Sequence, residues 1–398
     1  MISCKNLLSV VLLAMAVAPA AEAQSIYCPV QSNVDMLNHV RRKQATRREF
    51  ILPDVNGFHV YKADLHMHTI YSDGSTTPEY RMQEAWYDGL DVIAITDHVE
   101  YRRWEGKMLS FLKGYLPEGT KAVNDNVIRT PANEKGIQTD LNVPYKAAAA
   151  LENKYGITVI PGAEITREPV AIGHYNALFI KDANTLYDAD PAVSMKNARK
   201  QGALIMHNHP GWSRKTVKMT EFENKVYGMN LIDGIEVMNG GEFYPTIVQR
   251  AKDYKLFMSA NTDMHGTTLM DYVGDQRNMT LILAKDKSLA SLKEALKERR
   301  TLAYSFGTIA GDEQLVKDFF LACVKFEVFY TNDKGRRSIR MTNMSSVDYV
   351  INFGSYSLQL RPFTSRDVTA DKGKSVTFTV ENMWIPGDAK HPVISVNP

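Results

Sequence analysis

Histidine and acidic residues recur at the ends of apolar, strand-like segments of this chain. His66 and His68 lie two residues apart at the end of the first such segment, so in a strand both side chains point to one face. Two imidazoles on one face can hold a divalent metal ion, although an H-x-H pair alone is weak evidence. Asp73 follows in the tight loop Ser72-Asp73-Gly74, where its carboxylate can reach back over the same position.

Later segments carry the same residue types at similar positions. The further candidates are His98, Glu164, His174, His207, His209, Asp263 and His265. A single such histidine is most often a hydrogen-bonded core residue, but recurrence on strand after strand indicates a metal centre. Mixed imidazole and carboxylate ligands suit Zn, Mn or Fe. The set is larger than one ion can use, so we expect two or three divalent ions, with Glu164 as the best bridging carboxylate.

Such a centre favours hydrolysis over nucleophilic catalysis by a side chain. Clustered ions lower the pKa of a bound water and stabilise the oxygens of a displacement at phosphorus. The chain contains neither a G-x-S-x-G elbow nor a P-loop.

Positive and aromatic side chains follow the metal motifs closely. Arginine suits phosphate oxygens through its planar fork. The candidates are Arg102, Arg103, Arg167 and Arg214, of which Arg102 and Arg167 are preferred. Tyr101, Trp104 and Trp212 either frame an apolar pocket for an ester group or pack in the core.

The elements that must position these residues alternate between strand and helix. Strands are expected at 58–65, 91–96, 157–160, 175–180, 203–206, 234–238, 256–260 and 281–284, and helices at 77–88, 145–155, 191–201, 245–254 and 289–299. This alternation implies parallel pairing and an α/β barrel or near-barrel, with its site at the C-terminal ends of the strands. The segment 100–144 is unusually long for a connection, and such insertions often form lids or binding loops.

The pattern changes after about residue 310. Short strands are expected at 321–330, 338–342, 349–352, 357–360 and 375–381, which predicts a small antiparallel β domain. Packing on the barrel is the favoured role for this domain, and ligand binding is the alternative.

The N-terminus has the pattern of a secretory signal peptide. Lys5 precedes an apolar run over 7–17, and Ala21-Glu22-Ala23 supplies a small-x-small site, so cleavage before Gln24 is expected. The run is too short for a stable membrane anchor, and no later stretch is apolar enough to span a membrane. The predicted organisation is a signal peptide at 1–23, a catalytic domain at 24–310 and a β-rich domain at 311–398, exported to the periplasm or out of the cell.

Composition narrows the classes of partner. The net charge of +2 lacks the basic excess of a duplex-binding protein, which argues against nucleic acid. Cys28 and Cys323 remain after signal removal, and they either pair in an oxidising compartment or stay as buried free thiols. The sequence leaves the oligomeric state open.

Taken together, the motifs resemble the PHP superfamily, named for its polymerase and histidinol phosphatase members. D-x-H-x-H-T, S-D-G, I-T-D-H, G-x-E-I-T, H-P-G and D-x-H-G occur in this order between residues 58 and 266. The resemblance implies a distorted seven-stranded β/α barrel with a trinuclear centre. It implies one ion among His66, His68, Glu164 and Asp263, a second among Glu164, His174 and His209, and a third among Asp73, His98 and His265. Asp73 stands where some members have histidine.

Finer segments resemble the secreted PHP-type phosphodiesterases. These segments are 51–55, 95–102, 164–167, 173–177 and 208–212. The resemblance implies a metal-dependent hydrolase of small phosphodiesters, in which a metal-bridging hydroxide attacks phosphorus and His98 and Asp263 are essential. His207 departs from an aromatic position of that group, so it is interpreted as a neighbour of the ligands or a proton donor.

Three alternative functions stay open at this point. A phosphomonoesterase, or a nucleotide or nucleic-acid phosphodiesterase, would use the same metal centre. A non-enzymatic exported binding protein is disfavoured by the intact set of ligands.

Overall fold

The computed structural model describes residues 27–30, 33–39, 46–99, 140–166, 171–186, 188, 190–272, 277–387 and 390–398. The chain divides into two units, 1–46 and 47–398. In the first unit, β1 (Tyr27–Val30) pairs with β2 (Asn33–His39) in an antiparallel hairpin. The predicted signal peptide and residues 100–139 of the predicted insertion lie outside the described residues.

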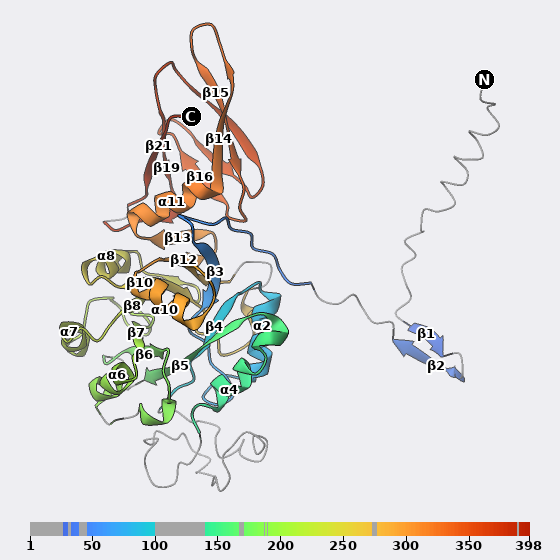
Figure 1. Cartoon of the computed structure of the whole chain (residues 1–398), viewed down its shortest axis with the longest axis vertical. Coiled ribbons are helices and arrows are strands. Elements are labelled where there is room, and N and C mark those ends of the chain that lie inside the picture. The colour runs from blue at the N-terminus through green and yellow to red at the C-terminus, as the bar shows by residue number, and fades with distance from the viewer. Residues whose placement is uncertain are drawn as a thin grey trace. The chain divides into compact units, whose positions relative to one another are not determined.

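A curled sheet forms the body of the second unit (Figure 1). Its strand order is β10-β8-β7-β6-β5-β4-β3-β11-β12-β13-β20, and β9 pairs with β8. The bounds are β3 (His59–Asp64), β4 (Val92–Ile95), β5 (Thr158–Thr166), β6 (His174–Leu178), β7 (Leu204–His207), β8 (Gly234–Asn239), β9 (Glu242–Phe243), β10 (Phe257–Asn261), β11 (Met279–Ala284), β12 (Thr301–Ser305), β13 (Thr308–Gly311) and β20 (Met383–Trp384). The predicted α/β class and barrel-like sheet are confirmed.

Strand direction departs from the prediction at β6. The pairs β3–β4, β4–β5, β7–β8 and β8–β10 are parallel as expected, but β6 is antiparallel to both β5 and β7. Only residues 167–173 connect β5 to β6, and a parallel crossover needs a dozen or more residues. The expectation of uniformly parallel pairing was therefore wrong at β6, and also at β11, which is antiparallel to β3 and β12.

Helices lie around the curled sheet (Figure 1). They are α2 (Pro78–Tyr87), α4 (Val143–Ala149), α5 (Glu152–Tyr155), the 3₁₀ helix η1 (Ala183–Thr185), α6 (Pro191–Lys200), α7 (Glu221–Gly228), α8 (Pro245–Asp253), α9 (Thr268–Asp271), α10 (Leu289–Lys297) and α11 (Glu313–Cys323). The predicted start of α2 is confirmed: the Thr77 side chain accepts a hydrogen bond from the Tyr80 amide, with Pro78 at the first position.

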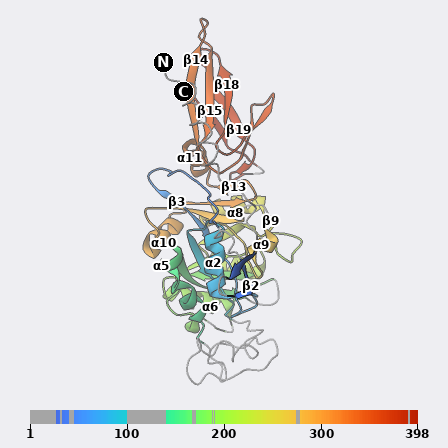
Figure 2. The ribbon, with the colours of Figure 1, turned by 90° about the vertical axis from the view of Figure 1, so that its right-hand side faces the viewer.

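The C-terminal strands form two small antiparallel sheets beyond one end of the curled sheet (Figure 2). One sheet has the order β14-β15-β18 and the other β17-β16-β19-β21. Their bounds are β14 (Val324–Thr331), β15 (Arg337–Asn343), β16 (Tyr349–Asn352), β17 (Ser357–Leu360), β18 (Ser365–Ala370), β19 (Val376–Val380) and β21 (Val393–Val396). The predicted antiparallel β region is confirmed.

Helix α11 replaces the start of the strand expected at 321–330. The Asp312 side chain accepts hydrogen bonds from the amides of Gln314 and Leu315 and so begins the helix. The buried residues Val316, Phe319, Phe320 and Cys323 follow helical spacing on one face. Residues 321–323 are therefore helical, and the strand begins at residue 324.

One apolar cluster joins this β region to the curled sheet. It includes Leu281 and Leu302 from the curled sheet, and Phe320, Tyr349 and Phe378 from α11 and the small sheets. The domain boundary near 310 stays a prediction.

Cys323 is buried and forms no disulfide with another described side chain. The Cys28 side chain lies outside the described residues, so the pairing of the two cysteines stays open. Among the described residues, no helix has the length and apolar character needed to cross a membrane.

Candidate metal centre

The predicted ligands meet at the C-terminal ends of several strands. His66 and His68 follow β3, His98 follows β4, and Asp263 follows β10. Donor atoms gather into three groups in which all atoms lie within 4.8 Å of one another: His68, Asp73, His98 and His265; His66, His68 and Asp263; and His66, Glu164 and His209.

Glu164 lies between four imidazoles. Its Oε2 is 2.8 Å from His98 Nδ1 and 3.4 Å from His68 Nε2. Its Oε1 is 3.3 Å from His174 Nδ1 and 3.5 Å from His66 Nε2. Each oxygen can therefore bind a different ion, as expected of a bridging carboxylate.

Asp263 and Asp73 occupy the remaining gaps between the rings. Asp263 Oδ1 lies 3.1 Å from His66 Nε2 and 3.0 Å from His68 Nε2. Asp73 lies 3.2 Å from His98 Nε2 and 3.4 Å from His265 Nε2. The histidines predicted to share an ion with each aspartate are thus neighbours of that aspartate in space.

These distances fit metal ions. Donors bound to one ion at about 2.0–2.2 Å are separated by about 3–3.5 Å, and most of the distances between donors here lie in or close to this range. Glu164 Oε2 is buried and accepts no hydrogen bond, although two histidine nitrogens lie close to it. The Nε2 atoms of His66 and His68 face each other at 3.2 Å, and a cation bound by both would accept the lone pair of each nitrogen.

His68 takes part in two of the donor groups. Its Nε2 faces Asp263 at 3.0 Å, and its Nδ1 lies 3.6 Å from Asp73. A neutral imidazole has one free lone pair, so His68 can bind an ion through one nitrogen only. The predicted grouping with His66 and Asp263 uses Nε2.

The carboxylates of the centre are held in the charged form. Burial by itself raises the pKa of each carboxyl, but the neighbouring imidazoles outweigh burial. His98 and His66 hold the pKa of Glu164 well below its usual range, and His265 and His98 do the same for Asp73. The pKa of Asp263 is lowered mainly by His66 and His68.

The pKa values of two of the histidines, His66 and His209, are shifted in opposite directions. Burial lowers the pKa of His66, but Asp263, Glu236 and Glu164 together raise it well above its usual range. For His209, burial dominates over the opposing charge of Asp263 and lowers the pKa to about 4. A neutral His209 keeps a lone pair free for metal binding.

Two of the predicted ligands have a strained backbone. His209 has φ 23° and Asp263 has φ 54°, both in the left-handed region that non-glycine residues rarely adopt. The His209 amide donates to Glu236 Oε2 at 2.7 Å, and the Asp263 amide donates to the His66 carbonyl at 2.9 Å. Strained residues held in this way are common at functional sites.

Sequence reasoning missed Glu236, which is fully buried in β8. Its Oε1 lies 2.9 Å from His66 Nδ1, and its Oε2 accepts from the amide of His209. A carboxylate on the far nitrogen of a ligating histidine fixes the ring and leaves the other nitrogen for the metal. A single charged residue inside the apolar segment 234–238 was the available signal.

Asp97 and Asn208 were also missed. Asp97 accepts hydrogen bonds from the Thr69 amide at 2.8 Å and from the Ser72 hydroxyl at 2.6 Å, which fixes the loop that carries Asp73. Asn208 donates to Glu164 Oε1 at 2.8 Å. Both stand next to predicted ligands in the motifs I-T-D-H and H-N-H-P.

His207 lies outside the three donor groups. Its Nδ1 is 2.9 Å from the Tyr227 hydroxyl and its Nε2 is 3.5 Å from Glu223, and burial lowers its pKa. Its predicted role beside the ligands stays a prediction. Arg214 is engaged by Glu223 at 3.0 Å.

Trp212 lies at the edge of the centre. Its side chain is 45% exposed, and its ring centroid is 5.4 Å from those of both His174 and His209. The other predicted substrate contacts, Tyr101, Arg102, Arg103, Trp104 and Arg167, lie outside the described residues.

Comparisons with known proteins address the family of the chain and its fold. The family model of the PHP domain matches residues 64–298. A two-domain protein from Bacteroides vulgatus, described as containing a predicted PHP-like metal-dependent phosphoesterase, is 31% identical with a TM-score of 0.75, over 88% of this chain and 98% of that chain. A candidate metal-dependent phosphoesterase from Bifidobacterium adolescentis is 15% identical with a TM-score of 0.38, over 59% of this chain and 96% of that chain. Comparison with curated proteins found no match.

The family model and the first of these structures are sufficient for an assignment. The chain belongs to the PHP domain family.

Proposed function

We propose that the chain is an exported metal-dependent phosphoesterase that hydrolyses small phosphodiesters with two or three divalent ions, Zn, Mn or Fe. The observation that carries this proposal is the placement of Glu164 and Asp263, each between several imidazoles at 2.8–3.6 Å. Divalent ions bound in such a cluster lower the pKa of a coordinated water and neutralise charge on phosphate oxygens.

The protein's own residues orient the ligands and border the substrate. Glu236 and Asp97 hold His66 and the Asp73 loop, so the donor positions are set before any ion binds. His265 is the most exposed of the predicted ligands, with its side chain 44% exposed.

Trp212 supports a diester rather than a monoester. A diester keeps a second organic group on an equatorial oxygen during the displacement, because the nucleophile attacks opposite the leaving group. An apolar surface can bind this retained group. The exposed indole beside His174 and His209 offers such a surface. Turnover of a monoester alone would instead favour a phosphatase.

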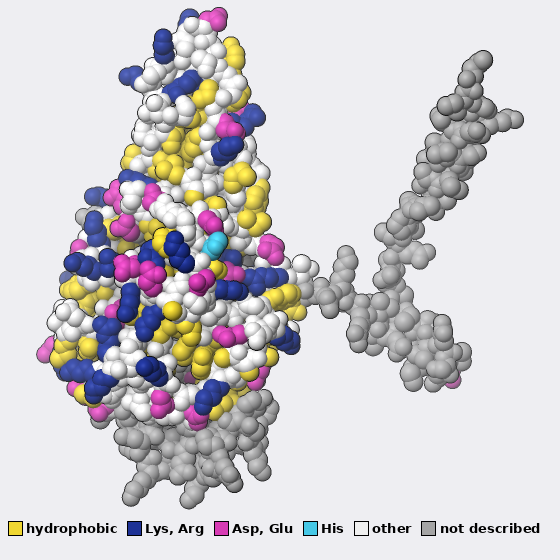
Figure 3. Space-filling view, viewed as in Figure 1, with side chains coloured by type: hydrophobic (Ala, Val, Ile, Leu, Met, Phe, Trp, Pro, Cys, Tyr) yellow, Lys and Arg dark blue, Asp and Glu magenta, His cyan; other side chains and the backbone are white. Residues whose placement is uncertain are grey.

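The interspersed charges of the surface argue against a polymeric nucleic acid as substrate. Lysine and arginine side chains alternate with acidic ones over the face in Figure 3, in keeping with the net charge of +2. Proteins that bind nucleic acid usually present a continuous basic surface.

The deciding experiment compares hydrolysis of bis(p-nitrophenyl) phosphate and p-nitrophenyl phosphate by the metal-loaded mature protein. We expect faster turnover of the diester, and its loss with chelator and in His98→Ala and Asp263→Ala. His59→Ala is the matched control, because this exposed histidine contacts Asp54 outside the centre. Full activity in His98→Ala would show that the metal assignment is wrong.

Export is proposed from the N-terminal sequence pattern alone. Cell fractionation should recover the protein outside the cytoplasm, and sequencing of its N-terminus should begin at Gln24. An intact Met1 on the recovered protein would refute this part of the proposal.

A further inference from the structure

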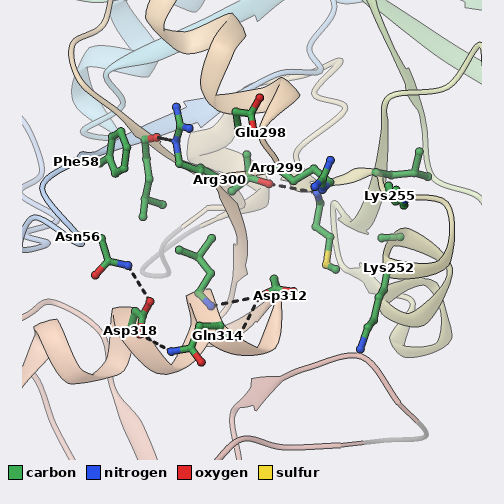
Figure 4. Close-up of a pocket in the computed structure, with 16 residues that line it drawn as sticks. Asn56, Phe58, Lys252, Lys255, Glu298, Arg299, Arg300, Asp312, Gln314 and Asp318 are labelled. Carbon is green, nitrogen blue, oxygen red and sulfur yellow. Dashed lines mark hydrogen bonds between the residues drawn. The ribbon is translucent and has the colours of Figure 1, made fainter.

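A cavity bordered by Phe58, Lys255 and Arg299 lies in the second unit (Figure 4). Phe58 stands before β3, Leu256 stands before β10, and both line the cavity, whereas the metal ligands follow the far ends of these strands. The rise of a β-strand separates Leu256 from Asp263 by about 20 Å. The cavity is therefore distinct from the proposed active site.

The cavity has the size of a ligand site. Its volume is about 540 Å³, within the range of roughly 300–1,000 Å³ typical of small-molecule pockets. Phe58, Leu256, Met258, Leu283 and Leu315 supply the apolar part of its lining.

Several charged residues at the rim already have partners. Asp318 accepts from Asn56 and Gln314 (Figure 4), and Asp312 begins α11. Arg300 donates to Glu294 at 2.8 Å. These residues build the walls and are not free to bind a ligand.

Three basic side chains of the lining, those of Lys252, Lys255 and Arg299, make no hydrogen bond or ion pair with another described residue. Lys252 belongs to the last turn of α8, whereas Lys255 and Arg299 each follow a helix. Glu298 is the one acidic lining residue whose side chain likewise makes no such contact among the described residues. The side chains left available therefore carry a net positive charge.

The backbone of Lys255 and Arg299 is a second, independent observation. Lys255 follows α8 and Arg299 follows α10, and each has φ 56° in the left-handed region. Glycine is the usual residue at this position after a helix, because a side chain there is strained. Attraction to a helix C-terminus explains a basic residue nearby, but α8 and α10 already have Lys252 and Lys297 in their last turns.

We propose that this cavity is a second ligand site, which binds a small organic anion. Lys255 and Arg299 contact the charged group of the ligand, which is a carboxylate, phosphate or sulfonate. Phe58, Leu256 and Met258 contact its apolar part. This site is independent of the proposed phosphoesterase activity.

The test uses 8-anilinonaphthalene-1-sulfonate as the probe, because it joins a sulfonate to an apolar aromatic body. Its fluorescence is titrated with the metal-loaded full chain and with the double variant Lys255→Gly, Arg299→Gly. Glycine relieves the left-handed strain, so this variant should fold with an unchanged or higher Tm. The control Lys325→Gln, Lys374→Gln removes the same charge from two exposed positions of the C-terminal region, on β14 and in the turn before β19.

We expect saturable binding by the wild type and the control, and binding weaker by about tenfold or more in the glycine variant. Diester turnover should be equal in all three proteins, because the cavity lies far from the metal centre. The proposal is overturned if the wild type shows no saturable binding or if the glycine variant binds within twofold of it. If the probe inhibits diester turnover competitively, with an inhibition constant equal to its binding constant, then it binds in the metal centre. That result would also overturn the proposal.

Discussion

Glu236→Gln removes a negative charge beside the metal centre while keeping the side-chain shape. Four donors converge on the two oxygens of Glu236: His66 and Asn261 on Oε1, and the His209 amide and Asn239 on Oε2. A glutamine has only one oxygen, so in either orientation its amide group faces two of these donors. The substitution therefore disturbs the His66 ring and the His209 backbone together.

The expected effect on metal binding follows from this geometry. Loss of a carboxylate behind a ligating histidine weakens metal affinity about 10–100-fold, which equals about 1.4–2.7 kcal/mol. The buried donors left facing an amide add a loss of about 1–3 kcal/mol in the free energy of unfolding.

Competition with a chromogenic chelator measures the affinity, and urea unfolding of the metal-free protein measures the stability. Asp233→Asn is the control, since Asp233 precedes the same strand at its other end and contacts Arg199 and the Ile205 amide. It should lower stability and leave metal affinity unchanged. If Glu236→Gln binds Mn or Zn as tightly as the wild type, the positioning role of Glu236 is refuted.

Three further predictions concern the loop at Gly74, the ions and the buried thiol. In Gly74→Ala, the new Cβ would lie 2.8 Å from backbone atoms of His68, so the loop must move and carry Asp73 with it. We expect the kcat for the diester to fall by roughly 100-fold. A kcat equal to that of the wild type would contradict this prediction. Removing the ions with a chelator should lower the Tm by about 5 °C or more, reversibly on adding Mn, and calorimetry checks this.

Burial raises the pKa of Cys323 from 9.0 to about 11, so in a Cys28→Ser background the thiol should resist Ellman's reagent at pH 8 until the protein unfolds. Because the raised pKa favours the neutral thiol in the fold, its contribution to stability is complete below pH 9. As the pH rises from 9 to 11, this contribution should be lost, and the stability difference from Cys323→Ala should shrink by about 3 kcal/mol.

Local sequence patterns predicted most elements of the curled sheet. The apolar run of β4 and the Thr-Pro start of α2 are local signals, and both elements formed within a residue or two of the expected bounds. Helix α11 also had a local signal, since Asp312 and the spacing of Val316, Phe319 and Phe320 are helical. The strand expected at 321–330 therefore began three residues too early.

The direction of β6 was not a local property. The segment 175–180 reads as a buried strand in either orientation, because the alternation of side chains along a strand is the same in both directions. Its orientation depends on the length of the connection from β5 and on which neighbours it pairs with.

The sequence by itself determined the chemical character of the centre. Imidazoles and carboxylates at strand ends indicate candidate metal ligands, because the chemistry of a ligand is a property of the residue type. Only the tertiary structure decided which donors share a space, since His66, Glu164 and Asp263 are far apart in the chain and meet at 3.1–3.5 Å. It also decided the role of Glu236 and the existence of the cavity at Lys255 and Arg299, because both depend on the packing of distant segments.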